Sequence, residues 1–528
     1  MRETAGSGVR LSQLLAAVSL GTDLGMGQPM EHVLRQSVIA LRLAERLRLP
    51  SADREVVYYS SLLAWVGCHV DAYEQAKWFG DDLALKREIR FVDEGRALDL
   101  AKFVLRHLGA GRPAVTRARL AATFAGEGRR VIDEIEENHW RTVDGLMDRL
   151  GLSETIRASV AQTFERWDGK GDPEGVAGED LLLATRLVNL ADVVEVFHHA
   201  AGVDAAVAVA RERSGTQFDP TIVELFCESA EEIFAELEAV TSWDALMASE
   251  PKLDRELSDA ELDGALAAIG DFVDLKSPYT LGHSTGVAEL AAAAGTAYGL
   301  PAEEVRGLRR AALLHDLGRL GVSNAIWDTT ARLTGSEMER VRMHPYLTER
   351  MLASTPALSS LASLAGQHHE RVDGSGYPRG LVGDAISPAA RILAAADFYR
   401  AKLEPRPHRP AVSTDDAEAL LREEVRAGRI DGGAADAVLR AAGHRVRRRR
   451  EWPAGLTARE VEILRLVARG LSHKEIAEEL VIARKTASNH VERIYVKAGV
   501  TNRAMAALFA VKHGLMSTED LMAGSDIG

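Results

Sequence analysis

Cysteine, aromatic residues and long apolar runs are all scarce in this chain of 528 residues. The cysteines are Cys68 and Cys227, too few for a disulfide framework or a cysteine-based metal site. Aromatic residues make up 5% of the chain, and no stretch of about 18 uninterrupted apolar residues occurs. The opening residues lack the basic and then apolar pattern of a signal peptide. We therefore expect a soluble protein of the reducing cytoplasm with no membrane partner.

Alternating apolar and polar residues, the pattern of a half-buried strand, are also lacking. Helical periodicity is frequent instead: EHVLRQSVIALRLAERL, LDLAKFVLRHL and STGVAELAAAAGTAYGL place apolar residues at i, i+3, i+4 and i+7. With 46% hydrophobic and 27% charged residues, the composition is that of a globular protein. The sequence predicts an all-α protein of about three or four domains.

The charge of the chain is distributed unevenly. The formal net charge is −14, yet residues 445–515 hold 15 Lys and Arg against 7 Asp and Glu, a net of +8, which leaves −22 for the remainder. A basic segment on an acidic body is typical of a nucleic-acid-binding domain attached to a sensor or an enzyme. A solvated run of charge is the alternative until a motif supports DNA binding.

One loop of the sequence occurs twice. QTFERWDGKGDPEG from Gln162 aligns with QHHERVDGSGYPRG from Gln367 at an offset of 205, and RLVNLADVVEV then matches RILAAADFYRA. Upstream, SSLLAWVGC matches RAALLHDLGR at an offset of 251, so the first copy contains an insertion of 46 residues that we expect to be helical. Two similar helical domains in tandem are the simplest explanation. The predicted boundaries are 1–245 for the first copy, 246–264 for a joint, 265–443 for the second copy, 444–455 for a basic linker, 456–515 for a last compact segment and 516–528 for a tail.

The second copy carries imidazoles and carboxylates that suit a metal site. The candidates are five histidines and two aspartates: His283, His315, Asp316, His344, His368, His369 and Asp397. Neutral imidazoles with carboxylates suit iron, manganese or zinc, and a carboxylate can bridge two cations. A two-metal site activates water and stabilises both attacking and leaving oxygens at a phosphorus atom, so phosphoester hydrolysis is the natural chemistry.

These motifs, LLHDLG, RMHPYLTERML, HHERVDGSGYP and RILAAADFYRA, resemble the HD-GYP family, metal-dependent phosphohydrolases of the HD superfamily that cleave cyclic di-GMP. The resemblance covers about residues 265–443. It implies that the seven residues are metal ligands, with Asp316 as the bridge, and that the cofactors are two divalent transition metals, Fe or Mn. It implies catalytic roles for Asp316, Arg319, Glu370 and Tyr377, with Glu370 and Arg371 also bracing the loop. We expect Gly374 and Gly376 to take positive φ angles.

The chain departs from the family pattern at three positions. Arg319 stands where the family has Lys, Arg400 stands where a second Asp often follows Asp397, and Tyr279 stands where some members carry a Glu ligand for a third metal. Two metals are therefore expected rather than three. A folded but inactive relative is the alternative.

In the first copy, the matching positions have lost most of the candidate ligands. They read His32, Ala64, Trp65, His139, Thr163, Phe164 and Asp192. Methyl and indole groups cannot coordinate a cation, and Trp65 and Phe164 would fill the space with apolar bulk. The first copy is thus predicted to be a degenerate HD domain that packs, pairs or binds a regulatory ligand, with His32 and His139 as satisfied core residues.

The basic end reads as four short helices. The first starts near Thr457 and stops at Gly470, Ser472 caps the second, and the third starts near Thr486. The pattern resembles the LuxR-type helix-turn-helix domain, in which the third helix enters the major groove. The predicted DNA-binding residues are Arg484, Lys485, Thr486, Asn489, His490, Arg493 and Lys497. The family implies a homodimer through the fourth helix, while a helical protein-binding tail is the alternative.

The sequence thus leads to a transcription regulator in which a LuxR-type domain is joined to an HD-GYP domain that hydrolyses cyclic di-GMP or a related phosphoester. Its expected partners are DNA and a cyclic dinucleotide. The alternative is a ligand- or metal-sensing DNA-binding protein without catalytic turnover.

Overall fold

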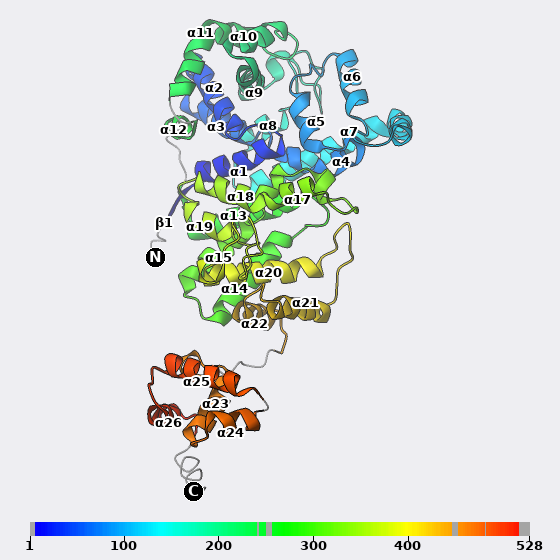
Figure 1. The fold of residues 1–528 in the computed structure, drawn as a ribbon. Helices are drawn as coiled ribbons and strands as arrows, with labels where there is room; N and C mark the ends of the chain where they lie inside the picture. Colours follow the sequence, from blue (N-terminus) through cyan, green and yellow to red (C-terminus); the bar gives the residue numbers. More distant parts are fainter. Residues whose placement is uncertain (1–5, 240–241, 250–255, 446–451, 481, 517–528) are drawn as a thin grey trace. The chain divides into compact units, whose positions relative to one another are not determined.

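The computed structural model describes residues 6–239, 242–249, 256–445, 452–480 and 482–516, with the side chains of residues 6–7, 129, 131–139, 236, 238–239 and 458 left aside. The chain divides into two compact units, Met1–His444 and Arg445–Gly528. The first unit contains both copies of the repeat, and the second contains the basic segment (Figure 1). The all-α prediction is confirmed, apart from one short antiparallel ribbon of β1 (Gly6–Arg10) and β2 (Glu256–Ser258). The finer six-part division stays a prediction.

The helices of the first copy run from residue 11 to residue 248. They are α1 (Leu11–Gly25), α2 (His32–Arg46), α3 (Ser51–Leu63), η1 (Val66–His69), α4 (Ala72–Phe79), α5 (Asp82–Ile89), α6 (Ala97–His107), α7 (Ala114–Arg149), α8 (Glu154–Ala161), η2 (Gly178–Asp180), α9 (Leu183–Ala201), α10 (Val203–Glu212), α11 (Pro220–Ala239) and α12 (Ser242–Ala248).

The helices of the second copy run from residue 259 to residue 441. They are α13 (Asp259–Asp274), α14 (His283–Tyr298), α15 (Ala302–Leu314), η3 (Leu317–Gly321), α16 (Asn324–Trp327), α17 (Gly335–Arg342), α18 (His344–Ala353), α19 (Ser359–Ala365), η4 (Gly383–Ala385), α20 (Pro388–Leu403), α21 (Thr414–Arg426) and α22 (Gly432–Ala441). Helix α13 crosses the predicted boundary at residue 265 and packs on α14 and α15.

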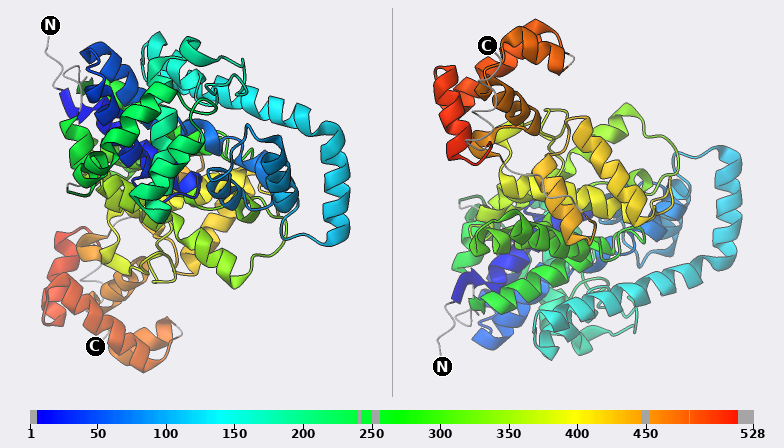
Figure 2. Two further views of the ribbon diagram at one scale, coloured as in Figure 1. Left: turned by 90° about the horizontal axis from the view of Figure 1, so that it is seen from above. Right: turned by 90° about the horizontal axis from the view of Figure 1, so that it is seen from below.

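The two copies share the register that the sequence offsets predict. Helices α2, α3 and η1 begin 251 residues before α14, α15 and η3, whereas α8, η2 and α9 begin 205 residues before α19, η4 and α20. The Asp172–Pro173 and Tyr377–Pro378 peptides, also 205 apart, are both cis. The insertion between these blocks is helical as expected, and the first part of α7 stands clear of the rest of the unit in both views of Figure 2.

The two copies pack directly against each other. Helix α1 contacts η3 and α18 of the second copy. A methyl group on Gly21 of α1 would lie 2.9 Å from Leu320 Cδ1 and 3.4 Å from Leu317 Cδ1, so the two copies approach closely here. Nε2 of the His69 ring lies 2.9 Å from Phe272 O of the second copy, where an N–H on the ring can donate to this carbonyl. The first copy therefore touches the short η3 segment that follows the His-Asp pair.

The second unit is a bundle around its own apolar core. It consists of η5 (Pro453–Gly455), α23 (Ala458–Ala468), α24 (His473–Glu479), α25 (Arg484–Ala498) and α26 (Arg503–Lys512). Thr457 and Ser472 form capping boxes with Glu460 and Glu475 at the starts of α23 and α24, which confirms the predicted Ser472 cap. Gly470 follows α23 with φ +97°, the left-handed conformation predicted for a residue that ends a helix.

Among the described residues, the helices include none that is long and apolar enough to cross a membrane.

Candidate metal centre and nucleic-acid interface

The structure brings the seven candidate ligands of the second copy together. They come from the starts of α14 and α18, the α15–η3 junction, the loop after α19 and the middle of α20. Six of the seven are buried, and His369 is half-buried. Three overlapping groups have ligand atoms within 4.8 Å of one another: His344, His368 and His369; His283, His315 and Asp397; and His315, Asp316 and His368. We call these seven residues the His/Asp cluster.

Backbone carbonyl groups fix the orientation of three rings in the cluster. Nδ1 of His315 lies 2.7 Å from Ala312 O, Nδ1 of His344 lies 2.6 Å from Val341 O, and Nδ1 of His368 lies 2.7 Å from Ala365 O. In each case the acceptor is the carbonyl three residues earlier. These bonds assign the proton of the neutral imidazole to Nδ1, so each Nε2 carries a lone pair. Carbonyl contacts of this kind typically orient metal-ligating histidines.

The lone pairs converge on a space that calls for a cation. Nε2 of His344 lies 3.0 Å from Nε2 of His368, and two lone pairs at this distance repel unless a positive centre lies beside them. Nε2 of His315 is buried and has no hydrogen-bond partner among the described residues. A buried polar atom left unpaired is costly. The donor set therefore fits divalent transition metals.

The pKa values of the buried histidines favour the neutral, ligating form. Burial lowers the pKa of His344 to about 4 and that of His368 to about 3. Burial likewise holds the pKa of His369 well below its usual value. At neutral pH these three imidazoles are uncharged and can bind a cation without first losing a proton.

His283 behaves differently because two carboxylates surround its ring. Burial disfavours its charged form, but Asp397, 3.2 Å from Nε2, and Glu404, 2.9 Å from Nδ1, raise its pKa to about 10. A cation bound at Nε2 would have to displace this proton. No sequence motif identified Glu404 as a residue of this site.

Asp316 lies between the two halves of the cluster. Its Oδ1 is 3.4 Å from His344 Nε2 and 3.6 Å from His368 Nε2, while its Oδ2 is 3.7 Å from His315 Nε2. Burial alone would raise its pKa, but neighbouring His315 and Arg319 hold the pKa of Asp316 well below the usual range. The carboxylate is therefore ionised, with one oxygen turned toward each side.

The remaining predicted catalytic residues surround the cluster. Arg319 donates to Asp316 Oδ2 at 3.0 Å and lies over the Trp327 ring, 4.2 Å from its centroid. The Tyr377 ring lies against His369, with centroids 4.8 Å apart. Both oxygens of Glu370 accept backbone N–H bonds, from Arg379 and Leu381 at 2.8 Å, so this side chain is committed to the loop.

One glycine prediction holds and the other is wrong. Gly374 has φ +83°, as expected, but Gly376 is not in the left-handed region. Gly376 is required by close approach instead, because a Cβ there would lie 2.3 Å from Arg371 N and 2.6 Å from the Glu370 backbone. The sequence alone could not separate these two uses of glycine.

In the first copy, protein cations surround the acids at the matching place. Nε2 of His32 lies 3.1 Å from Asp192 Oδ1, and its Nδ1 bonds Glu195. Arg90 donates to Asp192 Oδ2 at 3.1 Å while its guanidinium lies 3.6 Å from the Trp65 ring centroid. His32 is buried with both ring nitrogens bonded, which confirms the core-residue prediction.

Trp65 and Phe164 touch edge to face, with centroids 5.7 Å apart, as the prediction of apolar filling requires. Arg90 shares that space, which the sequence did not indicate. The side chain of His139 lies outside the described residues.

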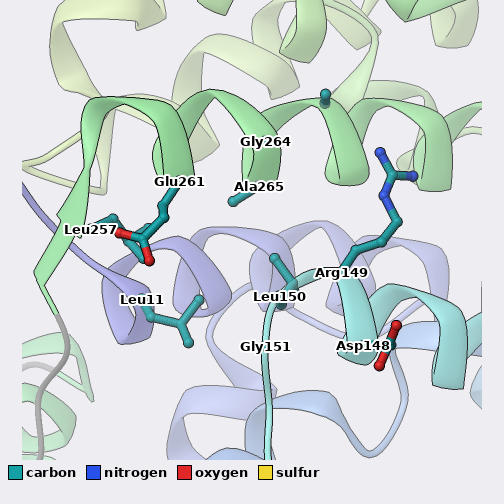
Figure 3. A pocket seen from close by; sticks show the side chains of 10 residues that line it. Leu11, Asp148, Arg149, Leu150, Gly151, Leu257, Glu261, Gly264 and Ala265 are labelled. Atoms are coloured by element: carbon teal, nitrogen blue, oxygen red, sulfur yellow. The ribbon is translucent and has the colours of Figure 1, made fainter.

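A groove of about 350 Å³ lies elsewhere, between α1, the end of α7 and the start of α13 (Figure 3). Its charged residues are already engaged: Arg149 donates to Asp271 at 3.0 Å, Arg157 donates to Asp148 at 3.2 Å, and Glu261 caps α13 with Ser258. The groove shares no residue with the His/Asp cluster.

In the second unit, α25 presents most of the predicted DNA-binding residues. Ala487, Val491 and Ile494 are buried in the core, and the opposite face exposes Arg484, Lys485, Thr486, Asn489 and Arg493, with His490 half-buried. Lys497 differs, because its Nζ donates to both carboxylate oxygens of Glu460, at 2.8 and 3.0 Å. Its charge is therefore engaged within the domain. The linker arginines 447–450 lie outside the described residues.

Comparisons with known proteins agree with this description. An HD-domain family matches residues 268–433, and the family described as bacterial regulatory proteins, luxR family, matches residues 454–510. The chain is 33% identical to the 3′3′-cGAMP-specific phosphodiesterase 3 of Vibrio cholerae over 420 residues, which cover 79% of this chain and 91% of that protein.

A cyclic di-GMP phosphodiesterase response regulator of Xanthomonas campestris is 40% identical over 144 residues, covering 27% of this chain and 38% of that protein. The crystal structure of a cyclic GMP-AMP specific phosphodiesterase of V. cholerae superposes with a TM-score of 0.57 at 27% identity, covering 82% of this chain and 98% of that one. The chain therefore belongs to the HD-GYP family of metal-dependent phosphodiesterases, and it joins this enzyme to a luxR-family DNA-binding domain.

Proposed function

We propose that the His/Asp cluster binds two divalent ions, iron or manganese, and hydrolyses a phosphodiester bond of a cyclic dinucleotide. The observation that carries this proposal is the convergence of Nε2 lone pairs that backbone carbonyls have fixed in advance. Imidazoles with carboxylates suit both metals. Core packing gives no reason for lone pairs to face one another at 3.0 Å.

The ligands divide into two sets. His283, His315 and Asp397 would hold one ion, and His344, His368 and His369 would hold the other. Asp316 would bridge them, since each of its oxygens faces a different set. When bound, the two ions would lower the pKa of a water molecule and offset charge on the phosphate.

The surrounding residues would place the substrate and shape the pocket. Arg319, bonded to Asp316 and stacked on Trp327, would direct its positive charge toward the phosphate. Tyr377 would form a wall beside His369. Glu370 would act through the loop that it holds, as a positioning residue rather than a catalytic one.

We propose 3′3′-cGAMP and cyclic di-GMP as the substrates to test. The relative that covers 79% of this chain is named for the first, and the shorter Xanthomonas match is named for the second. Both molecules carry the same 3′,5′ phosphodiester links, so the cluster chemistry does not separate them.

For the second unit, we propose that α25 enters the major groove. The exposed face of Arg484, Lys485, Thr486, Asn489 and Arg493 would meet phosphates and base edges, with His490 at its margin. Helix α26 exposes Leu508 (71%) and Met505 (43%), which supports the proposal that the protein acts as a homodimer through this helix.

The test is hydrolysis of both cyclic dinucleotides by protein purified without oxygen and loaded with Fe²⁺ or Mn²⁺. We expect linear dinucleotide from the wild type and none from the His368→Ala, His369→Ala double variant. His199→Ala, which removes an exposed histidine of the first copy, is the matched control and should keep full activity. Metal and dinucleotide binding without any product would instead support a sensor without turnover.

A further inference from the structure

His283 differs from the other buried ligands in what holds its Nδ1. His315, His344 and His368 each bond the carbonyl three residues earlier. For His283 that carbonyl belongs to Thr280, and the backbone N–H of His283 already donates to it at 2.9 Å. The Nδ1 of His283 bonds a side-chain acceptor instead. This acceptor is Glu404 Oε2, 2.9 Å from Nδ1.

The first copy meets the same need from a different position. His32, which matches His283, bonds Glu195 through Nδ1, and Glu195 lies three residues after Asp192 on α9. Three residues after Asp397 the second copy has Arg400 instead. In the first copy the acceptor of the histidine N–H thus lies inside α9, one turn after the aspartate. In the second copy the acceptor is Glu404, the residue that follows the last turn of α20 and has an extended backbone.

The arginine that supports the acceptor has moved as well. In the first copy, Arg35 of α2 donates to Glu195 Oε1 at 2.5 Å. The matching position on α14 is Gly286, and a Cβ there would lie 2.6 Å from Arg400 Nε. Arg400 fills that space and donates to Glu404 Oε1 at 3.0 Å, while Arg406 donates to Oε2 at 3.0 Å. The carboxylate that accepts from the histidine and the arginine that supports this carboxylate therefore occupy different positions in the two copies.

We propose that Glu404 is the positioning residue for His283, and that Gly286, Arg400 and Arg406 are present to hold its carboxylate. This inference rests on the proposed metal site. Glu404 fixes the ring so that Nε2 faces Asp397 and the ion, and it makes the imidazole more basic as a ligand. It compensates within this chain for the carboxylate absent at position 400.

The test measures Mn²⁺ affinity in the full chain without substrate, by competition with a chelator. Glu404→Ala should weaken binding about 10–100-fold at one of two sites, the range typical for loss of a group that orients a metal ligand. Glu404→Gln keeps the side-chain shape and should weaken it less. Glu423→Ala removes an exposed carboxylate of the same copy and should leave the affinity unchanged.

The decisive variant places a carboxylate at position 400, which matches Glu195 of the first copy. Arg400→Glu combined with Glu404→Ala should recover most of the Mn²⁺ affinity, whereas Arg400→Ala with Glu404→Ala should not. Unchanged affinity in Glu404→Ala, or no recovery with Arg400→Glu, would overturn the inference. Wild-type protein that binds Mn²⁺ but forms no linear dinucleotide would refute the proposed hydrolysis and leave this inference standing.

Discussion

A buried carboxylate of the first copy bonds the segment of the second copy that lies beside the His/Asp cluster. Asp82 of α5 is fully buried, and its Oδ1 accepts from Ser323 Oγ at 2.6 Å and from Asn324 N at 2.8 Å. Its Oδ2 lies 3.7 Å from the ammonium groups of Lys86 and Lys276. Asp82 therefore anchors the start of α16, whose Trp327 packs against Arg319.

Replacing Asp82 by Ala should be strongly destabilising. The change removes two hydrogen bonds to a charged acceptor and leaves two buried ammonium groups without the acid that pairs with them. Breaking a buried ion pair by removing one partner costs about 3–5 kcal/mol. At about 2.1 cal/mol/K per residue, the 444 residues of the first unit unfold with an entropy of roughly 0.9 kcal/mol/K, so the Tm of this unit should fall by about 3–5 °C.

The assay is calorimetry of the full chain, beside cyclic dinucleotide hydrolysis. Asp99→Ala, which removes an exposed ion pair with Lys102, is the control and should cost less than about 1 kcal/mol. Adding Lys276→Met to Asp82→Ala should recover part of the loss, because one unpaired charge disappears. A fall in Tm below about 1 °C for Asp82→Ala, or further loss on adding Lys276→Met, would refute the reasoning.

Three further predictions concern other parts of the chain. Burial lowers the pKa of Lys276 to about 8, whereas the pKa of a lysine in the unfolded chain is about 10.4. Between these two pH values the unfolded state binds more protons than the folded state, so the free energy of unfolding should rise with pH by up to about 3 kcal/mol relative to Lys276→Met. The Tm of both proteins, measured from pH 7.5 to 10.5, checks this prediction. Gly376→Ala should abolish hydrolysis, since its Cβ has no room, while Gly374→Ala should cost about 1 kcal/mol and retain activity. Arg493→Ala should reduce the slope of log affinity for duplex DNA against log salt by about 1, whereas Lys497→Ala should mainly lower the Tm of the second unit.

Local sequence patterns predicted a large part of the fold and of the site. Two offsets read from the repeat reproduce the starts of matching helices in both copies. The adjacent pairs His315-Asp316 and His368-His369 could be identified because each lies in a short continuous motif, LLHDLG and HHERVDGSGYP respectively. Caps such as Ser472 follow from residues three apart, which the sequence displays directly.

Features that depend on distant partners could not be predicted in this way. Glu404 reaches His283 across 121 positions, and its direction depends on how the chain leaves α20. Lys497 has the spacing of an outward residue, but the packing of α25 beside α23 brings Glu460 within reach of it. The pairing of β1 with β2 joins segments about 250 residues apart and carries no alternating pattern of useful length.

The two copies differ chiefly in the source of positive charge beside their buried acids. In the first copy, Arg90 pairs with Asp192 and the ring nitrogens of His32 are both bonded, so the buried charges are balanced by the protein itself. In the second copy, Arg319 bonds Asp316, and three imidazoles turn lone pairs inward rather than protons. Such a site gains more from binding cations than a site that already contains its own. The first copy thus lacks most of the histidines of the cluster and instead has Arg90 paired with Asp192, so this buried acid is neutralised without a bound cation.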